Sequence, residues 1–169
     1  ETLLGASAAY QVNAVTELAV GDGARVSWSR LQAEGREAQH IGSLIARVGR
    51  DVNLDHLVVN AGAALSRWQA NVTLAGSGTR VGFYGANMLS GREHGDLTLV
   101  VEHTAPNTTS REIFKNVIDG EAHGVFQGRI VVQPVAQKTD GKMMTQTLLL
   151  SDGGYFDSKP ELESFADDV

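Results

Sequence analysis

Turn-forming residues recur along this chain at a nearly constant spacing, and this feature limits the folds open to it. Eight turn signals follow one another at intervals of about 14 residues. They fall at Asp22, Gly35, Arg50, Gly62, Ser77, Gly91, Pro106 and Gly120. Later turns are predicted at Asp140-Gly141 and Asp152-Gly153-Gly154. A fixed period indicates repeated units that bury their apolar faces by stacking on one another.

The segments between the turns have the length and pattern of strands. Apolar Leu97, Leu99 and Val101 alternate with Thr98 and Glu102, which predicts one inward and one outward face. The segment from residue 37 to 47 has a marginal length for a helix. Its β-branched residues and flanking glycines favour a strand.

Evenly spaced strands are typical of a sandwich, an up-and-down barrel or a solenoid. The two-residue hairpin signal Asn-Gly is absent from the sequence, which disfavours the antiparallel options. We therefore predict a parallel β-solenoid, with a two-sheet sandwich as the alternative. Two strands per coil give a coil of about 28 residues. In that register His40 lies over Val12 and under Trp68, and Leu97 lies under Val125.

Composition excludes several classes of function. The 169 residues suit one domain, residues 1–169, and the formal net charge is −6. No basic stripe indicates nucleic-acid binding, and no apolar stretch approaches the roughly 18 residues that span a bilayer. The chain has no cysteine, so it has neither a disulfide framework nor a thiolate metal site.

The five histidines are scattered through the sequence, and no pair has the i, i+4 spacing of a helical metal site. Stacked strands of a solenoid can still bring two of them together. We expect each to be a surface or core-edge residue. They are His40, His56, His94, His103 and His123.

Two other groups are candidates for chemistry. Acidic residues gather late in the chain, at Glu161, Glu163, Asp167 and Asp168. Strand alternation points the first two the same way, as in carbohydrate-active β-helix enzymes, although a solvated strand face is the simpler interpretation. Arg111 follows several hydroxyl residues and could bind an anion. Phosphate-loop and nucleophile-elbow motifs are absent.

The C-terminal half carries a series of characteristic motifs. The most specific are Lys-Thr-Asp-Gly, Lys-Pro-Glu-Leu-Glu and Ala-Asp-Asp-Val, in this order. The full set of stretches is His103–Arg111, Asp119–Gly128, Gln137–Gly141, Leu148–Ser151, Lys159–Glu163 and Ala166–Val169. In these stretches the chain resembles the SufB/SufD family of iron–sulfur cluster assembly proteins. SufB-like chains carry functional cysteines in this core, so the chain is more similar to the SufD branch.

The resemblance implies a single-stranded right-handed parallel β-helix, cut from a longer chain with helical flanking segments. It implies a cytoplasmic, non-catalytic scaffold that joins SufB and the ATPase SufC, with a nascent iron–sulfur cluster in the full complex and no cofactor in this fragment. The alternatives are a carbohydrate-active β-helix enzyme and an unrelated interaction solenoid. Neither a nucleic acid nor a membrane is expected as a partner.

In the family a Cys/Ser-His-Gly segment follows Ala-Asp-Asp-Val, and its histidine lies at the SufB–SufD interface. We expect this chain to stop just before that ligand, at Val169. The strand that leads to it is then the expected partner surface, and it also predicts a homodimer of the isolated domain. The expected interface residues are Lys159, Pro160, Glu161, Glu163, Asp167 and Asp168.

Overall fold

A computed structural model describes residues 1–5 and 8–168 of the chain. It contains two six-stranded sheets in which every neighbouring pair of strands is parallel. Sheet A has the order β1-β3-β5-β7-β9-β11, and sheet B has the order β12-β10-β8-β6-β4-β2. The strands are β1 (Thr2–Leu4), β2 (Gln11–Val20), β3 (Arg25–Ala33), β4 (Gln39–Val48), β5 (Asn53–Asn60), β6 (Leu65–Leu74), β7 (Arg80–Leu89), β8 (His94–His103), β9 (Thr109–Ile118), β10 (His123–Val132), β11 (Asp140–Leu149) and β12 (Tyr155–Ser164).

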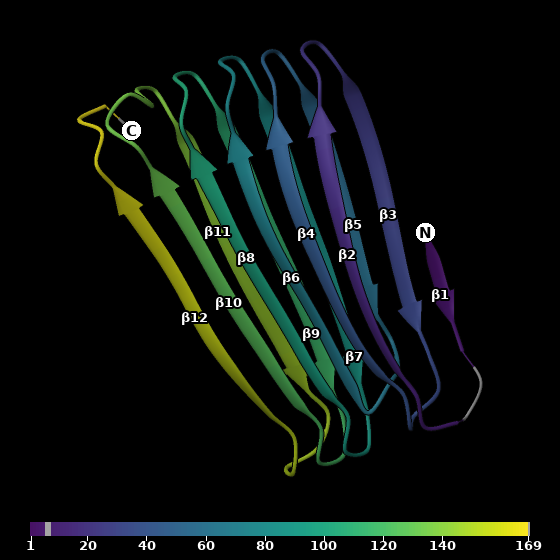
Figure 1. Cartoon of the computed structure of the whole chain (residues 1–169). Helices are drawn as coiled ribbons and strands as arrows, with labels where there is room; N and C mark the ends of the chain where they lie inside the picture. The colour runs from purple at the N-terminus through teal and green to yellow at the C-terminus, as the bar shows by residue number, and fades with distance from the viewer. Residues whose placement is uncertain (6–7, 169) are drawn as a thin grey trace.

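Each coil uses one strand from each sheet, which confirms the predicted parallel solenoid. In Figure 1 the chain rises in the nearer sheet, crosses at the top, descends in the farther sheet and advances toward the left. This is the right-handed sense that parallel crossovers almost always take. The N- and C-terminal ends therefore lie at opposite ends of the stack (Figure 1). The segment from residue 37 to 47 lies mainly in β4, as a strand.

The predicted coil length is right on average, but the predicted register is only partly right. His40 does pair with Val12, one coil earlier. The next partner of His40 is Ser66 rather than Trp68, because that coil is shorter than the one before it. Leu97 pairs with Phe126 rather than Val125, because that coil is longer than the average. The turns differ in length from coil to coil, so a constant period assigns some residue pairs to the wrong partners.

Left-handed backbone positions recur in the turns that lead from sheet B to sheet A. Gly23, Asp51, Gly78, Asn107 and Lys138 all have φ between 55° and 72° at equivalent places in successive coils. Glycine, aspartate and asparagine tolerate this conformation best, so the turn signals of the sequence have a direct structural cause.

One predicted turn is wrong. Asp140 and Gly141 begin β11 rather than forming a turn. The connection after β10 occupies residues 133–139, with its turn at Pro134 and Val135. The later signal at residues 152–154 does lie in the turn between β11 and β12.

The core fills the space between the two sheets. On β8 the predicted inward residues Leu97, Leu99 and Val101 are all at most 1% exposed. Rings from opposite sheets meet in the middle, where the centroids of Phe114 and Phe126 are 4.6 Å apart. The described ranges contain no helix of the length and apolar character needed to cross a membrane.

Candidate functional site

The C-terminal end of the solenoid exposes residues that belong to the core. Leu162 continues the inward column of Ile130, yet it is 63% exposed whereas Ile130 is 2% exposed. In sheet A, Leu149 continues the column of Ile118 and is 49% exposed, against 0% for Ile118. Terminal repeats of a solenoid need a cap over such residues. No described segment supplies one at this end.

The two edges at this end differ in chemistry. Strand β12 is charged: Lys159 Nζ lies 2.9 Å from Glu161 Oε1, and Arg129 Nη2 lies 2.5 Å from Glu163 Oε2. Pro160 offers no backbone N–H to a neighbouring strand. The second half of β11 carries no charged residue. Charges and proline protect an edge from unspecific pairing, so β11 is the better edge for adding a strand.

All the predicted interface residues lie at this end of the molecule. Lys159, Pro160, Glu161 and Glu163 are on β12, and Asp167 and Asp168 are in the segment after it. That segment is tied to the previous coil, because the backbone N–H of Lys138 donates to the carbonyl of Asp168. Val169 lies outside the described residues. The role of the six predicted residues in an interface remains a prediction.

Sequence reasoning missed the contribution of β11 to the same surface. Met144, Leu148 and Leu149 on this strand are 42%, 57% and 49% exposed. The sequence signal was the apolar run from Leu148 to Leu150. Exposed apolar residues beside an unpaired edge are typical of an interaction surface.

A ladder of side-chain amides runs through the interior of sheet A. Asn60 Nδ2 donates to Asn87 Oδ1 at 3.0 Å, and Asn87 Nδ2 donates to Asn116 Oδ1 at 2.9 Å. All three residues are at most 2% exposed. The ladder ends at β11, where Asn116 Nδ2 lies 3.2 Å from Thr147 Oγ1. The sequence signal for this ladder was the recurrence of asparagine at close to one coil length, at Asn60, Asn87 and Asn116.

A second interior polar group centres on His103, which is fully buried. Its Nδ1 lies 2.7 Å from Thr108 Oγ1, and its Nε2 lies 3.0 Å from Ser110 Oγ. Burial lowers the pKa of His103 to about 4. Glu112 is also fully buried, and neither of its oxygens has a hydrogen-bond partner among the described residues. Burial raises the pKa of Glu112 to about 7, and the nearby Ser110 hydroxyl and the charge of Arg111 offset only part of this.

The structure assembles the suggested anion site at Arg111 only in part. The hydroxyls of Thr108 and Ser110 point into the core toward His103. Arg111 lies on the opposite face of β9 and pairs with the Asp140 side chain. Strand alternation places these two hydroxyls on the face opposite the guanidinium, and of the three hydroxyl residues only Thr109 shares the face of Arg111.

The N-terminal coils hold a third polar group. Arg30 Nη2 lies 2.5 Å from His40 Nε2, and His40 Nδ1 lies 2.6 Å from Glu34 Oε2. Burial lowers the pKa of His40, and the charge of Arg30 adds to this effect. Tyr10 closes the group by donating to Glu34 Oε1 at 3.1 Å. Arg30, Glu34 and His40 thus form one connected polar group within the core, in which His40 Nδ1 lies close to Glu34 without a well-aligned hydrogen bond.

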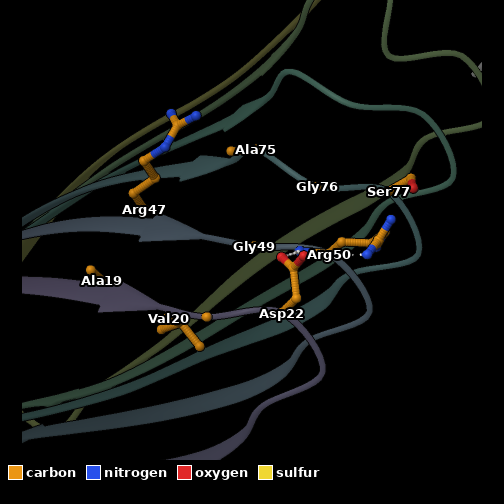
Figure 2. Close-up of a pocket in the computed structure, with 10 residues that line it drawn as sticks. Ala19, Val20, Asp22, Arg47, Gly49, Arg50, Ala75, Gly76 and Ser77 are labelled. Atoms are coloured by element: carbon orange, nitrogen blue, oxygen red, sulfur yellow. Dashed lines mark hydrogen bonds and ion pairs between the residues drawn. The ribbon is translucent and has the colours of Figure 1, made fainter.

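A hollow of about 550 Å³ lies along the turns that connect sheet B to sheet A in three successive coils. Asp22 Oδ1 accepts a 2.7 Å hydrogen bond from the backbone N–H of Arg50 on the next coil. The Arg50 guanidinium lies close to Asp22 and Asp51. Arg47 extends away from this pair, as Figure 2 shows. Because Arg50 is held by two carboxylates, we assign this row of turns a structural role in joining successive coils.

The histidines fall into two classes. His40, His56 and His103 are buried, whereas His94 and His123 are half-buried neighbours on the outer face of sheet B. Within the described ranges no group of three or more histidine, aspartate or glutamate residues could hold a metal ion.

Comparison with known proteins places the chain in context. The family model "SUF system FeS cluster assembly, SufBD core domain" matches residues 1–169. The SufBD family protein slr0076 of Synechocystis is 29% identical over 160 residues, which cover 95% of this chain and 35% of the relative. Protein ABCI7 of Arabidopsis thaliana is 28% identical, over 95% of this chain and 34% of the relative.

The Escherichia coli iron–sulfur cluster assembly protein SufD is 32% identical over 108 residues, covering 64% of this chain and 26% of SufD. The chain thus spans about a third of the length of the curated relatives that match most of it.

Proposed function

The chain belongs to the SufBD family of iron–sulfur cluster assembly proteins, and on this basis we propose that it is the core of a SufD-type scaffold subunit. In this proposal it is a cytoplasmic, non-catalytic protein. It pairs with a SufB homologue and works with the SufC ATPase. The nascent cluster is the cargo of the complex and not a resident cofactor of this domain.

The observation that carries the proposal is the uncapped C-terminal end. Leu149 and Leu162 extend buried core columns into solvent, and the β11 edge beside them is uncharged. A partner that adds strands there would pair the free backbone groups and cover the two leucines. A second β-solenoid has the geometry to continue both sheets at once.

The interior of the domain also suits a scaffold. The chain has no cysteine, so thiolate ligands for a cluster would come from a partner or from another part of the full protein. The polar groups of the core bond to one another in the Asn60–Asn116 ladder and around His40. The late acids Glu161 and Glu163 form ion pairs, which gives no support to carbohydrate chemistry.

Co-purification tests the proposal. The full-length protein is co-expressed with the SufB and SufC homologues of its own organism and isolated through a tag on SufC. We expect all three proteins in one complex. The variant L149D should lose SufB, because a charge replaces an apolar contact. The control V15D changes an exposed residue on the outer face near the N-terminal end of the solenoid, and this variant should still bind SufB. Absence of wild-type protein from the complex would overturn the proposal.

A further inference from the structure

The two accessible histidines of the chain are direct neighbours. His94 and His123 begin β8 and β10 and are Cα partners in sheet B. Their ring centroids are 4.6 Å apart, with an angle of 73° between the ring planes. The other three histidines are at most 1% exposed. Any metal ion that binds imidazole on the folded domain therefore meets this pair first.

The His123 ring is held in place by the next coil. Its Nε2 lies 2.8 Å from Asp157 Oδ2 on β12, and the Tyr155 ring stacks on it at 3.9 Å between centroids. A carboxylate accepts a hydrogen bond from Nε2–H, which leaves Nδ1 with its lone pair. A carboxylate that orients a ligating imidazole in this way is the usual partner of histidine in metal sites.

His94 is available as a second donor. Its ring makes no hydrogen bond within the described part of the chain. Burial lowers its pKa, and the neighbouring His123 adds to the effect. Two imidazole nitrogens about 2.0 Å from one ion, at roughly a right angle, place their ring centroids about 4.5 Å apart. The observed separation is of this size, and the rings meet edge to face, so binding requires the His94 ring to turn until both nitrogens point to one ion.

We propose that His94 and His123 bind a divalent late transition-metal ion, such as Ni²⁺, Cu²⁺ or Zn²⁺, with Asp157 as the positioning residue. The site offers two protein ligands, so water or a group from another molecule completes the coordination. Affinity should follow the usual order for imidazole ligands, with Cu²⁺ above Ni²⁺ and Zn²⁺. The site stands on the outer face of sheet B and is independent of the proposed scaffold function.

Calorimetric titration of the tag-free, full-length protein with Ni²⁺ tests the site. We expect H94Q and H123Q each to weaken Ni²⁺ binding at least about tenfold, because chelation is lost. D157N should weaken it by about tenfold or more, the usual effect of removing such an orienting carboxylate. The control Q127A changes an exposed residue on the same strand as His123 and should leave the affinity unchanged. Ca²⁺ should not bind, because it prefers oxygen ligands.

A variant that adds a histidine tests the site through a gain in Ni²⁺ affinity rather than a loss. Leu65 is the direct partner of His94 on the coil before it. L65H places a third imidazole in the same column and should tighten Ni²⁺ binding at least about tenfold. Equal Ni²⁺ affinity for the wild type and the H94Q/H123Q double variant would overturn the proposal. So would an L65H variant with unchanged affinity, because it would show that rings of this column do not converge on one ion.

Discussion

The side-chain amide of Asn60 donates a 3.0 Å hydrogen bond to the side-chain carbonyl of Asn87, its direct neighbour in sheet A. The same relation joins Asn87 to Asn116 one coil later. These bonds run parallel to the backbone ladder and fix the stacking register from inside the core. A slip of one residue would turn every amide outward and leave apolar side chains in solvent.

Replacing the central member of this ladder should destabilise the domain. N87A leaves the Asn60 donor and the Asn116 acceptor buried without partners, each at a cost of about 1–3 kcal/mol. We therefore expect a loss of roughly 2–4 kcal/mol in the free energy of unfolding, measured by urea denaturation. The control N71A removes an exposed asparagine from β6 and should change stability by less than about 0.5 kcal/mol. Equal effects of the two variants would contradict the ladder's role.

Close packing between successive turns gives a second prediction. A Cβ added at Gly76 would lie 2.2 Å from the backbone nitrogen of Arg50, whereas a Cβ at Gly21 would meet nothing within 4 Å. Backbone cannot rotate aside as a side chain can, so the coils must separate. G76A should lower the free energy of unfolding by about 2 kcal/mol or more.

The matched variant G21A changes a glycine in the same stack of turns and should stay within about 0.5 kcal/mol of the wild type. Thermal and urea unfolding of both variants make the comparison. A G76A protein as stable as G21A would show that the turns are more loosely stacked than the structure has them.

The buried carboxyl of Glu112 gives a pH prediction. Its folded pKa of about 7 is above the ordinary value of 4.5. Between pH 4.5 and 7 the unfolded chain ionises this group while the folded chain keeps it protonated, so stability falls as the pH rises. The E112Q variant lacks this penalty. Its free energy of unfolding relative to wild type should rise by up to about 3 kcal/mol from pH 4.5 to pH 7.

Urea denaturation at several pH values checks this, with E37Q as the control. Glu37 is exposed in the turn before β4. The difference between E37Q and wild type should stay within about 0.5 kcal/mol over the same range. A flat difference for E112Q as well would mean that the carboxyl is hydrated or paired in solution.

Buried His56 should make the domain sensitive to acid. Burial lowers its pKa from 6.5 to about 4. Below pH 6.5 the unfolded chain takes up a proton that the folded chain refuses until about pH 4, so stability is lost as the pH falls through this window. H56F keeps a ring between Trp28 and Phe83 and removes the titration.

The variant should lose less stability than wild type between pH 6.5 and 4, by up to about 3 kcal/mol. His103 shares the same behaviour and remains in H56F, so acid sensitivity should decrease rather than vanish. An unchanged pH profile would contradict the assignment of His56.

The sequence was sufficient to predict the parallel solenoid and its average coil, because turn residues and strand alternation are local signals. It was not sufficient for the register beyond the first coils. His40 pairs with Ser66 and not Trp68, since the turns vary in length from coil to coil and those lengths depend on stacking. The start of β11 was mistaken for a turn, because Asp140-Gly141 has turn chemistry but pairs with Thr109 and Ser110.

The candidate site was predictable to a similar extent. The late charged residues lie on β12 and just after it, at the C-terminal end of the solenoid, and their role in an interface remains a prediction. The exposed columns ending in Leu149 and Leu162 were not predictable, because exposure of a core residue depends on whether anything covers it. The pairing of His94 with His123 also depends on a coil that is longer than the average, which no local pattern indicates.

The uncapped end leads to a final prediction, that the isolated 169-residue chain forms a homodimer through its C-terminal coils. Leu162 is 63% exposed although its column is buried in every other described coil from β4 onward. Covering such a residue regains about 1.5–3 kcal/mol, and two copies can cover each other. Sedimentation velocity should show a concentration-dependent dimer. L162K should shift the protein to monomer, because a lysine at this position disfavours burial, while V15K at the other end should not. A monodisperse wild-type monomer at high concentration would contradict this prediction.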